Sequence, residues 1–215
     1  MTNPASVPRR RGRPLDPNKD QIILESARNI LLTRGPRAMT MDAVASAAGV
    51  SKATLYSRYP SRKALLLAVV GSDAAFVSRA LVEEPTSAQG LHAQLCHFVT
   101  DLTAFLCCDH HRRLMQALAE EPQRRADLRQ IFRGGPQRTI DALARYLQSA
   151  DTRGLIRCAE PESSAELLLG MAMGMDLVRA LYGEPLARQQ SSARAEHVGR
   201  VVDSFMHLHQ RPQDA

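Results

Sequence analysis

The stretch TMDAVASAAGVSKATLYSRY, residues 40–59, decides the fold of the first part of the chain. Thr40 and Ser51 are good N-cap residues, and each precedes a short segment with apolar residues at helical spacing. Gly49 lies between the two segments and can adopt the left-handed conformation that a tight turn needs. Two short helices joined by such a turn are typical of a helix-turn-helix, although an ordinary helical hairpin gives the same pattern.

Helical periodicity also extends over the residues around this motif, and signals for β-strands are scarce. An apolar stripe of Ile23, Ala27, Ile30 and Leu31 predicts a helix before the motif, and Gly and Pro residues divide the remaining chain into further helical segments. We therefore predict an all-α fold of nine to ten helices. The expected organisation is a flexible basic arm at 1–17, a three-helix helix-turn-helix DNA-binding domain at 18–78, and a helical ligand-binding and dimerisation domain at 79–215.

The positive charge of the chain is concentrated in its first third. Residues 1–70 hold 12 Lys and Arg against 4 Asp and Glu, whereas residues 71–215 hold 16 against 18. A basic module joined to a near-neutral one indicates that only the first part contacts a polyanion such as double-stranded DNA. Hydrophobic residues make up 44% of the chain, which is enough for a core, but charges interrupt every long apolar segment. The four cysteines do not suggest a disulfide framework. We therefore expect a soluble cytoplasmic protein without membrane contacts.

The residues of the motif resemble the TetR family of bacterial transcriptional regulators. This resemblance spans residues 18–70 and rests on AAGVSKATLY, on the Tyr59-Pro60-Ser61 step and on the Ala64-Leu65 pair. It implies a two-domain α-helical homodimer that binds a palindromic operator with its N-terminal domain and a small ligand with its C-terminal domain. Ala53 and Lys63 depart from the family pattern, in which Gly or Pro and Glu, respectively, are frequent.

DNA contacts are expected from the arm, from the second helix of the motif and from the residues that flank it. The N-terminal part of that helix should reach base edges in the major groove, and Arg58 is expected on its exposed face. The resemblance adds Thr40, Tyr56 and Arg62, and it assigns Tyr59 mainly to packing. The run Arg9 to Pro14 is similar to an AT-hook and predicts either minor-groove entry or non-specific phosphate contacts. The full predicted set is Arg11, Arg13, Thr40, Ser51, Lys52, Ala53, Thr54, Tyr56, Ser57, Arg58, Tyr59, Arg62 and Lys63.

The C-terminal two thirds of the sequence carry no catalytic motif, so we predict that the protein is not an enzyme. His92, Cys96 and His97, the first two four residues apart, and the run Cys107 to His111 form a cluster that zinc, copper or a redox reaction could use. Since cysteines are more often small buried hydrophobes, we expect no cofactor and no metal. The run from His111 to the segment LLLGMAMGM loosely resembles the C-terminal domains of AefR-like TetR regulators.

Residues 161–182 read as one helix that is apolar on most sides, which predicts a core on one side and a second copy of the chain on the other. A central helix wrapped by its own chain is the alternative. The expected dimer interface comprises Leu167, Gly170, Gly174, Leu177, Val201 and Phe205. Met and Phe side chains also line adaptable pockets, unless they fill a solid core. The expected pocket residues are Phe98, Phe105, Met115, Met171 and Met175.

The leading functional hypothesis is a sequence-specific transcriptional repressor that a small molecule, apolar or weakly polar, releases from its operator. A constitutive architectural DNA-binding protein without an effector is the main alternative, because basic arms and short helices can also coat DNA without reading sequence. The third hypothesis is a metal or redox sensor that uses the Cys/His cluster.

Overall fold

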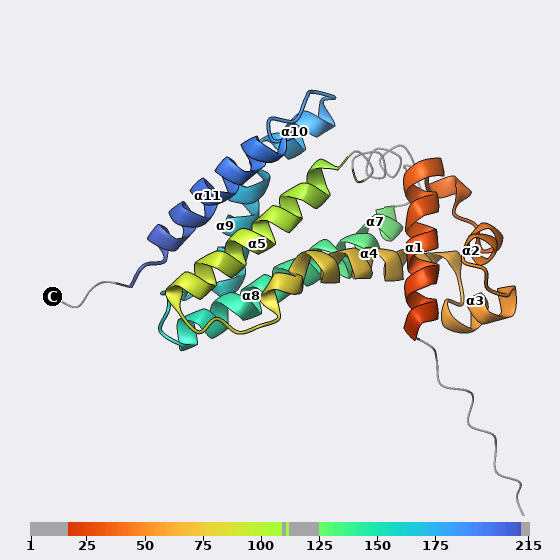
Figure 1. The fold of residues 1–215 in the computed structure, drawn as a ribbon, viewed down its shortest axis with the longest axis horizontal. Helices are drawn as coiled ribbons and strands as arrows, with labels where there is room; N and C mark the ends of the chain where they lie inside the picture. Colours follow the sequence, from red (N-terminus) through yellow and green to blue (C-terminus); the bar gives the residue numbers. More distant parts are fainter. Residues whose placement is uncertain (1–16, 109–110, 112–124, 212–215) are drawn as a thin grey trace, which may run out of the picture.

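The computed structural model describes residues 17–108, 111 and 125–211 of the 215. The described part of the chain is all-α, as predicted, with ten α-helices, two short 3-10 helices and no strand (Figure 1). The α-helices are α1 (Pro17–Arg34), α2 (Met41–Ala47), α3 (Lys52–Arg58), α4 (Arg62–Val77), α5 (Ala88–Cys107), α7 (Arg125–Gly134), α8 (Pro136–Thr152), α9 (Pro161–Met173), α10 (Asp176–Leu181) and α11 (Ser191–Leu208). The 3-10 helices are η1 (Pro36–Ala38) and η2 (Ser78–Leu81).

Side-chain caps fix the starts of the short helices. The Thr40 hydroxyl accepts a hydrogen bond from the Ala43 amide, and the Ser51 hydroxyl accepts one from the Thr54 amide, each at 3.1 Å. Gly49 between α2 and α3 has a φ of 63°, the left-handed conformation that the sequence predicted there. The N-caps and the glycine therefore specify the helix-turn-helix locally, before any tertiary contact is considered.

Two hydrophobic clusters divide the described residues. The first joins α1, α2, α3 and the start of α4, and the second joins the end of α4 to α5, α8, α9 and α11. Helix α4 belongs to both, because Val69 is buried in the first cluster and Val77 in the second. Figure 1 accordingly shows α4 running from the group of α1, α2 and α3 toward the helices of the second cluster. A continuous helix thus links the two parts.

The segment Arg62–Leu81 is also long and apolar enough to cross a membrane by length and composition alone. Its apolar side chains have a different environment in this fold. Leu65 and Val69 pack in the first cluster and Val77 packs in the second, all at most 2% exposed. The hydrophobicity of this segment is therefore explained by its position between two cores.

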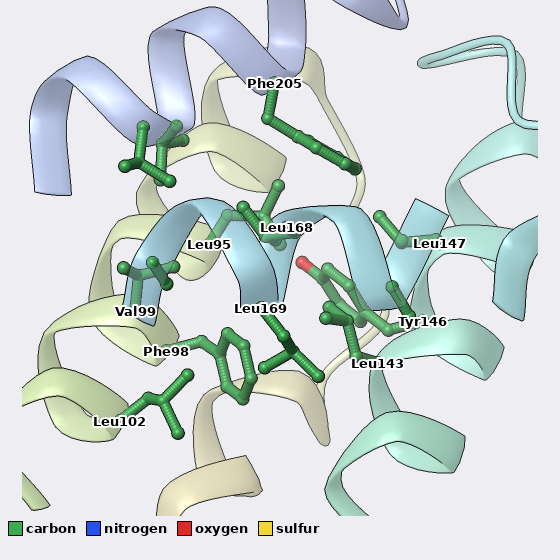
Figure 2. Close-up of a cluster of buried hydrophobic side chains, with 14 of the residues drawn as sticks. Leu95, Phe98, Val99, Leu102, Leu143, Tyr146, Leu147, Leu168, Leu169 and Phe205 are labelled. Atoms are coloured by element: carbon green, nitrogen blue, oxygen red, sulfur yellow. The ribbon is translucent and has the colours of Figure 1, made fainter. Parts of the chain in front are cut away.

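The second cluster is a packed core (Figure 2). Phe98 of α5 and Phe205 of α11 are fully buried in it, together with Leu143 and Leu147 of α8. Val201 is 5% exposed in the same core. The prediction that Val201 and Phe205 form a dimer interface is therefore wrong, because their own chain already buries them. Phe98 belongs to the same core, and its predicted place in a ligand pocket stays a prediction. The apolar stripe of α11 was read correctly, but it packs against its own chain.

The prediction of one continuous helix over residues 161–182 is also wrong. Gly174 has a φ of 48° and ends α9, and α10 begins two residues later. Gly174 thus ends a helix instead of lying inside one, but it is exposed, and its predicted place in a dimer interface stays a prediction. An alanine Cβ there would lie 2.8 Å from the Arg188 guanidinium.

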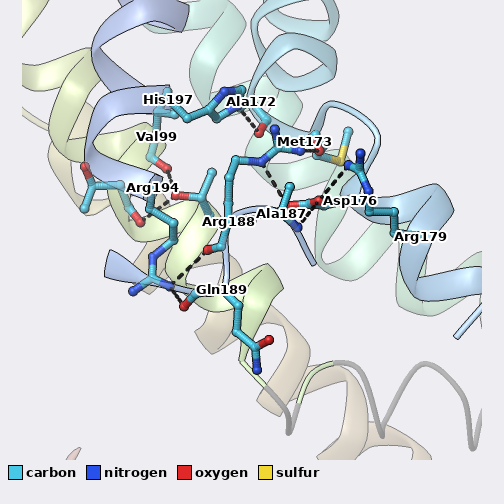
Figure 3. Close-up of polar contacts among 12 residues, drawn as sticks. Val99, Ala172, Met173, Asp176, Arg179, Ala187, Arg188, Gln189, Arg194 and His197 are labelled. Carbon is cyan, nitrogen blue, oxygen red and sulfur yellow. Dashed lines mark hydrogen bonds and ion pairs between the residues drawn. The ribbon is translucent and has the colours of Figure 1, made fainter. Parts of the chain in front are cut away.

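Asp176, two residues after this break, joins the start of α10 to the segment that precedes α11 (Figure 3). Its carboxylate accepts hydrogen bonds from the amides of Ala187 and Arg188 at 2.9 and 3.2 Å, and the Arg188 Nε atom lies 2.9 Å from it. Although burial opposes ionisation, the two amides and the Arg188 guanidinium hold the pKa of Asp176 below its usual value of 3.8. The buried carboxylate therefore fixes the connection between α10 and α11.

Candidate DNA-binding surface and domain junction

Helix α3 is the predicted recognition helix of the helix-turn-helix, and its Leu55 is fully buried. The opposite side of this helix is open to solvent, as expected for Lys52, Ala53, Tyr56 and Ser57. Tyr56 is 48% exposed, an unusual degree for an aromatic residue. A short helix with one buried side and a polar exposed side has the shape that enters a major groove.

Three hydroxyl residues near this surface are already hydrogen-bonded within the chain. The Ser51 and Thr54 hydroxyl oxygens lie 2.8 Å apart, and Ser57 donates to the Thr54 carbonyl at 2.8 Å. Hydroxyls that cap or bond within a helix are held in fixed orientations, and their remaining lone pairs or methyl groups stay available. Thr40 caps α2 in the same way and is exposed.

Lys52 stands at the start of α3 with its ammonium 2.8 Å from the Asp42 carboxylate. The hydrogen bond and charge of Asp42 raise the Lys52 pKa above its ordinary value of 10.5. Both side chains are about two thirds exposed, at 66% and 64%, so water screens the pair strongly. The pair therefore contributes little to stability. Lys63 is exposed at the start of α4.

Arg58 does not lie on the exposed face, and this prediction is wrong. Its side chain is only 5% exposed, and its Nη1 atom lies 2.6 Å from an oxygen of Asp20 in α1. The neighbouring Tyr59 donates its hydroxyl proton to the other oxygen of Asp20 at 3.2 Å. Burial, followed by the charge of Asp20, raises the pKa of Tyr59 to about 12. Asp20 therefore fixes the end of α3 against α1.

Arg62 also has an internal role that the sequence did not indicate. Its Nε donates to the Met39 carbonyl at 2.8 Å, and its Nη2 donates to the Pro36 carbonyl. Both carbonyls belong to η1 or to the residue that follows it, directly before the Thr40 cap. The Arg62 guanidinium thus holds the entry to the helix-turn-helix with two of its five N–H donors. Arg11 and Arg13, the predicted contacts of the arm, lie outside the described residues.

A cleft with a volume of about 620 Å³ lies at the junction of α1, α4 and the end of α5. Its walls include Leu24 and Arg28 of α1, Asp73 and Phe76 of α4, and Phe105 of α5. The size is within the range of small-molecule sites. Of the five predicted pocket residues, only Phe105 lines this cleft. Met171 packs against the second core, Met175 is 59% exposed, and Met115 lies outside the described residues.

An ion pair in the lining of the cleft joins α1 to α4. Arg28 of α1 and Asp73 of α4 approach to 2.6 Å, and a second Arg28 nitrogen donates to Asp73 at 2.8 Å. Ser72 accepts a further bond from Arg28 at 3.3 Å. Burial raises the pKa of Asp73 above its ordinary value of 3.8, against the opposing effect of Arg28. The sequence carried no local signal for this pair, because its members are 45 residues apart.

Comparison with known proteins finds one family match in the N-terminal part of the chain and another in the C-terminal part. Residues 23–69 match the family described as bacterial regulatory proteins, tetR family, and residues 93–211 match the AefR-like transcriptional repressor C-terminal domain. The chain belongs to the TetR family. It is a DNA-binding transcriptional regulator, as the sequence predicted, and the AefR-like character of its C-terminal domain is confirmed.

Relatives of this TetR-family regulator match it over most of their length. The uncharacterized HTH-type transcriptional regulator YvkB of Bacillus subtilis is 24% identical over 81% of this chain and 90% of its own. A TetR-family regulator from Mesorhizobium loti has the same fold, with a TM-score of 0.69, 22% identity and coverage of 91% and 98%. The flavonoid-responsive regulator FrrA gives a TM-score of 0.63 at 25% identity, with coverage of 93% and 100%.

Several large apolar side chains of this TetR-family regulator are exposed on α9, α10 and the residues beside them. Leu167 is 46% exposed and Leu177 is 61% exposed, and both were predicted in the dimer interface. The predicted Gly170 is also exposed, and no atom lies within 4 Å of where its Cβ would be. Met175, Val178 and Tyr182 extend the exposed apolar set. Apolar groups gathered in this way are typical of a protein interface.

The Cys/His cluster of the sequence is spread over separate places in this TetR-family regulator. His92 lies 2.7 Å from Asp203 and its other ring nitrogen is 3.8 Å from the Cys96 sulfur. Within the described ranges, no group of three His, Cys, Asp or Glu side chains could hold a metal ion. Burial raises the pKa of the Cys96 and Cys107 thiols, which disfavours the reactive thiolate. Asp109 and His110 lie outside the described residues.

Proposed function

We propose that this TetR-family regulator binds a palindromic operator as a homodimer and represses transcription until a small molecule releases it. The observation that carries this proposal is the continuous helix α4. It joins the cluster that positions α3 to the cluster of the C-terminal domain, so a change in one part can be transmitted to the other. The proposed domains keep the expected bounds of 18–78 and 79–215, preceded by the arm.

The proposed DNA-binding surface consists of the exposed residues on and beside α3. Tyr56 and Ser57 face solvent where base edges would lie, and Thr54 is held next to them. Lys52 and Lys63 would contact phosphates, which position the protein without reading sequence. Thr40, Ser51 and Ala53 complete the surface. We propose that Arg58, Tyr59 and Arg62 position this surface through their contacts inside the chain and do not contact DNA themselves.

A homodimer is proposed to form over α9 and α10. Leu167, Leu177 and Tyr182 are exposed in the single chain, and a second copy would remove them from water. The two copies of α3 must then lie about 34–36 Å apart to meet successive major grooves. The proposed site of action is the cytoplasm, where the DNA is, and no catalytic role is proposed.

Response to a small molecule is supported by the junction cleft and by the relative FrrA, whose name describes it as flavonoid-responsive. A ligand releases DNA only if it prefers the arrangement in which the recognition helices are wrongly placed. The architectural alternative needs no such cleft, and the metal or redox alternative lacks a reactive thiolate among the cysteines discussed above.

Selection of duplexes from random DNA, followed by footprinting, tests this function. The full chain should enrich one sequence with two inverted half-sites about one helical turn apart. Tyr56→Ala, on the proposed DNA-binding surface, should weaken binding to this duplex. Tyr182→Ala, on the exposed apolar surface of α9 and α10, should leave the base preference unchanged. Enrichment of no sequence, with uniform protection along the DNA, would support the architectural alternative and contradict the proposal.

A further inference from the structure

The junction cleft has mainly apolar walls that come from three helices. Leu24 and Leu32 of α1 lie on one side, and the rings of Phe76 of α4 and Phe105 of α5 contribute the others. Phe76 is 52% exposed, an unusual degree for a phenylalanine at the junction of two hydrophobic clusters. Exposed aromatic rings beside a concave site favour a ligand that has a large apolar body.

The described residues of the lining have a net negative charge. Glu25 and Asp73 contribute two carboxylates, and Arg28 contributes one guanidinium, which is engaged by Asp73. Burial lowers the pKa of His111 below its ordinary value of 6.5, so this imidazole is neutral at pH 7. Glu25 accepts a hydrogen bond from the Gln21 amide at 3.0 Å, a neutral donor. The lining residues that the structure describes therefore carry one negative charge in excess, which attracts a cation.

Phe76 already binds a cation within the chain. The guanidinium carbon of Arg79 lies 4.0 Å from the centre of the Phe76 ring. An aromatic ring carries partial negative charge on both faces, so each face can attract a positive group. Aromatic walls and an excess carboxylate together select a molecule that is both apolar and positively charged.

The same cleft contains the ion pair that connects α1 to α4. A cation in the cleft competes with Arg28 for the carboxylate of Asp73, which is 18% exposed and has Arg28 as its close partner. Weakening this pair loosens α1 from α4. Because Asp20 of α1 holds Arg58 and Tyr59 at the end of α3, a shift of α1 also shifts the recognition helix.

We propose that the junction cleft is the effector site of this regulator and that it takes a lipophilic organic cation. Binding of the cation weakens the Arg28–Asp73 pair and lowers the affinity for the operator. This inference rests on the proposed function for its effect on DNA, whereas binding of the cation to the cleft can be measured without DNA.

Tetraphenylphosphonium and tetraphenylborate provide matched probes, since they have the same shape and opposite charge. The chain contains no tryptophan, so a Phe105→Trp variant carries a single reporter in the wall of the cleft. Tetraphenylphosphonium should change its fluorescence in a saturable way and bind more tightly than tetraphenylborate. Calorimetric titration of the natural chain with both ions repeats the comparison if the reporter variant does not fold.

Two carboxylate variants test the site itself. Glu25→Gln keeps the shape and removes the charge, and it should weaken tetraphenylphosphonium binding about three- to tenfold. Glu184→Gln, at an exposed glutamate outside the cleft lining, should leave that affinity unchanged. Equal affinity for both ions, no saturable binding, or no effect of Glu25→Gln would overturn the assignment of the cleft.

The effect on DNA is measured with the duplex recovered from random DNA. Tetraphenylphosphonium should weaken binding of this duplex, and the duplex should weaken binding of the cation by the same factor. Cation binding that leaves the affinity for the duplex unchanged would overturn the role of the cleft as effector site. If the chain selects no duplex at all, the proposed function fails, and the fluorescence titration still tests the cleft.

Discussion

Replacement of Arg58 by alanine distinguishes an internal role of this residue from a role in base recognition. Arg58 lies on the helix that enters the major groove, but its side chain is only 5% exposed and pairs with Asp20 at 2.6 Å. Arg58→Ala should therefore lower the stability of the N-terminal domain. The same substitution should leave the base preference of the protein unchanged, because the exposed residues of α3 remain in place.

The size of the effect follows from the burial of the two partners. Removal of one member of a buried pair costs about 3–5 kcal/mol, whereas an exposed pair is worth about 0–1 kcal/mol. Asp20 is 39% exposed and can regain water once Arg58 is gone, so we expect an intermediate loss of about 2 kcal/mol. For a chain of this size, such a loss lowers Tm by about 4–8 °C.

Thermal unfolding followed by circular dichroism measures this loss. Arg200→Ala is the matched control, because Arg200 pairs with Glu196 while both side chains are about 70% exposed, at 69% and 72%. This control should change Tm by less than about 2 °C. Base preference is measured by repeating the selection from random DNA with Arg58→Ala. A Tm equal to that of Arg200→Ala, together with an altered selected sequence, would refute the internal role.

Three further perturbations have defined outcomes. Deletion of residues 1–14 should leave Tm unchanged and reduce the salt dependence of operator binding by up to about four units of slope, one for each arginine; an unchanged slope would contradict the role of the arm. Leu177→Glu should yield monomers in sedimentation, while the matched Val82→Glu should not, since Val82 is 79% exposed outside the proposed interface. In the folded chain the pKa of Tyr59 is raised to about 12, so Tyr59 ionises first in the unfolded chain, and stability falls as pH rises from 10 to about 12. Tyr59→Phe should reduce this loss of stability. Tyr146, whose pKa burial also raises, is present in both proteins, so an identical alkaline profile would argue against the contribution of Tyr59.

The features that the sequence predicted correctly depend on local rules. Thr40 and Ser51 cap their helices through residues three positions away, and Gly49 adopts its turn without help from elsewhere. Arg58 was misplaced because its partner Asp20 lies 38 positions earlier, on another helix. Arg62 was misplaced for the same reason, since it bonds to carbonyls 23 and 26 residues away.

Apolar periodicity identified buried stripes but not what covers them. The stripe of α11 that contains Val201 and Phe205 could pack equally well against the same chain or a second copy, and only the tertiary structure assigns it to the core. The break at Gly174 was missed because one glycine inside an apolar segment is tolerated in a helix. The bonds of the buried Asp176 to Arg188, 12 residues later, likewise gave no local signal in the sequence.

The most direct test of the account measures binding to the selected duplex when the distance between its half-sites is changed. Insertion of about five base pairs, half a helical turn, places the second half-site on the opposite side of the DNA. A dimer with two recognition helices held at a fixed distance should then lose at least about tenfold in affinity at constant salt, and insertion of a full turn should restore part of it. Equal affinity for all spacings would contradict the account, because it would mean that each chain binds its half-site independently.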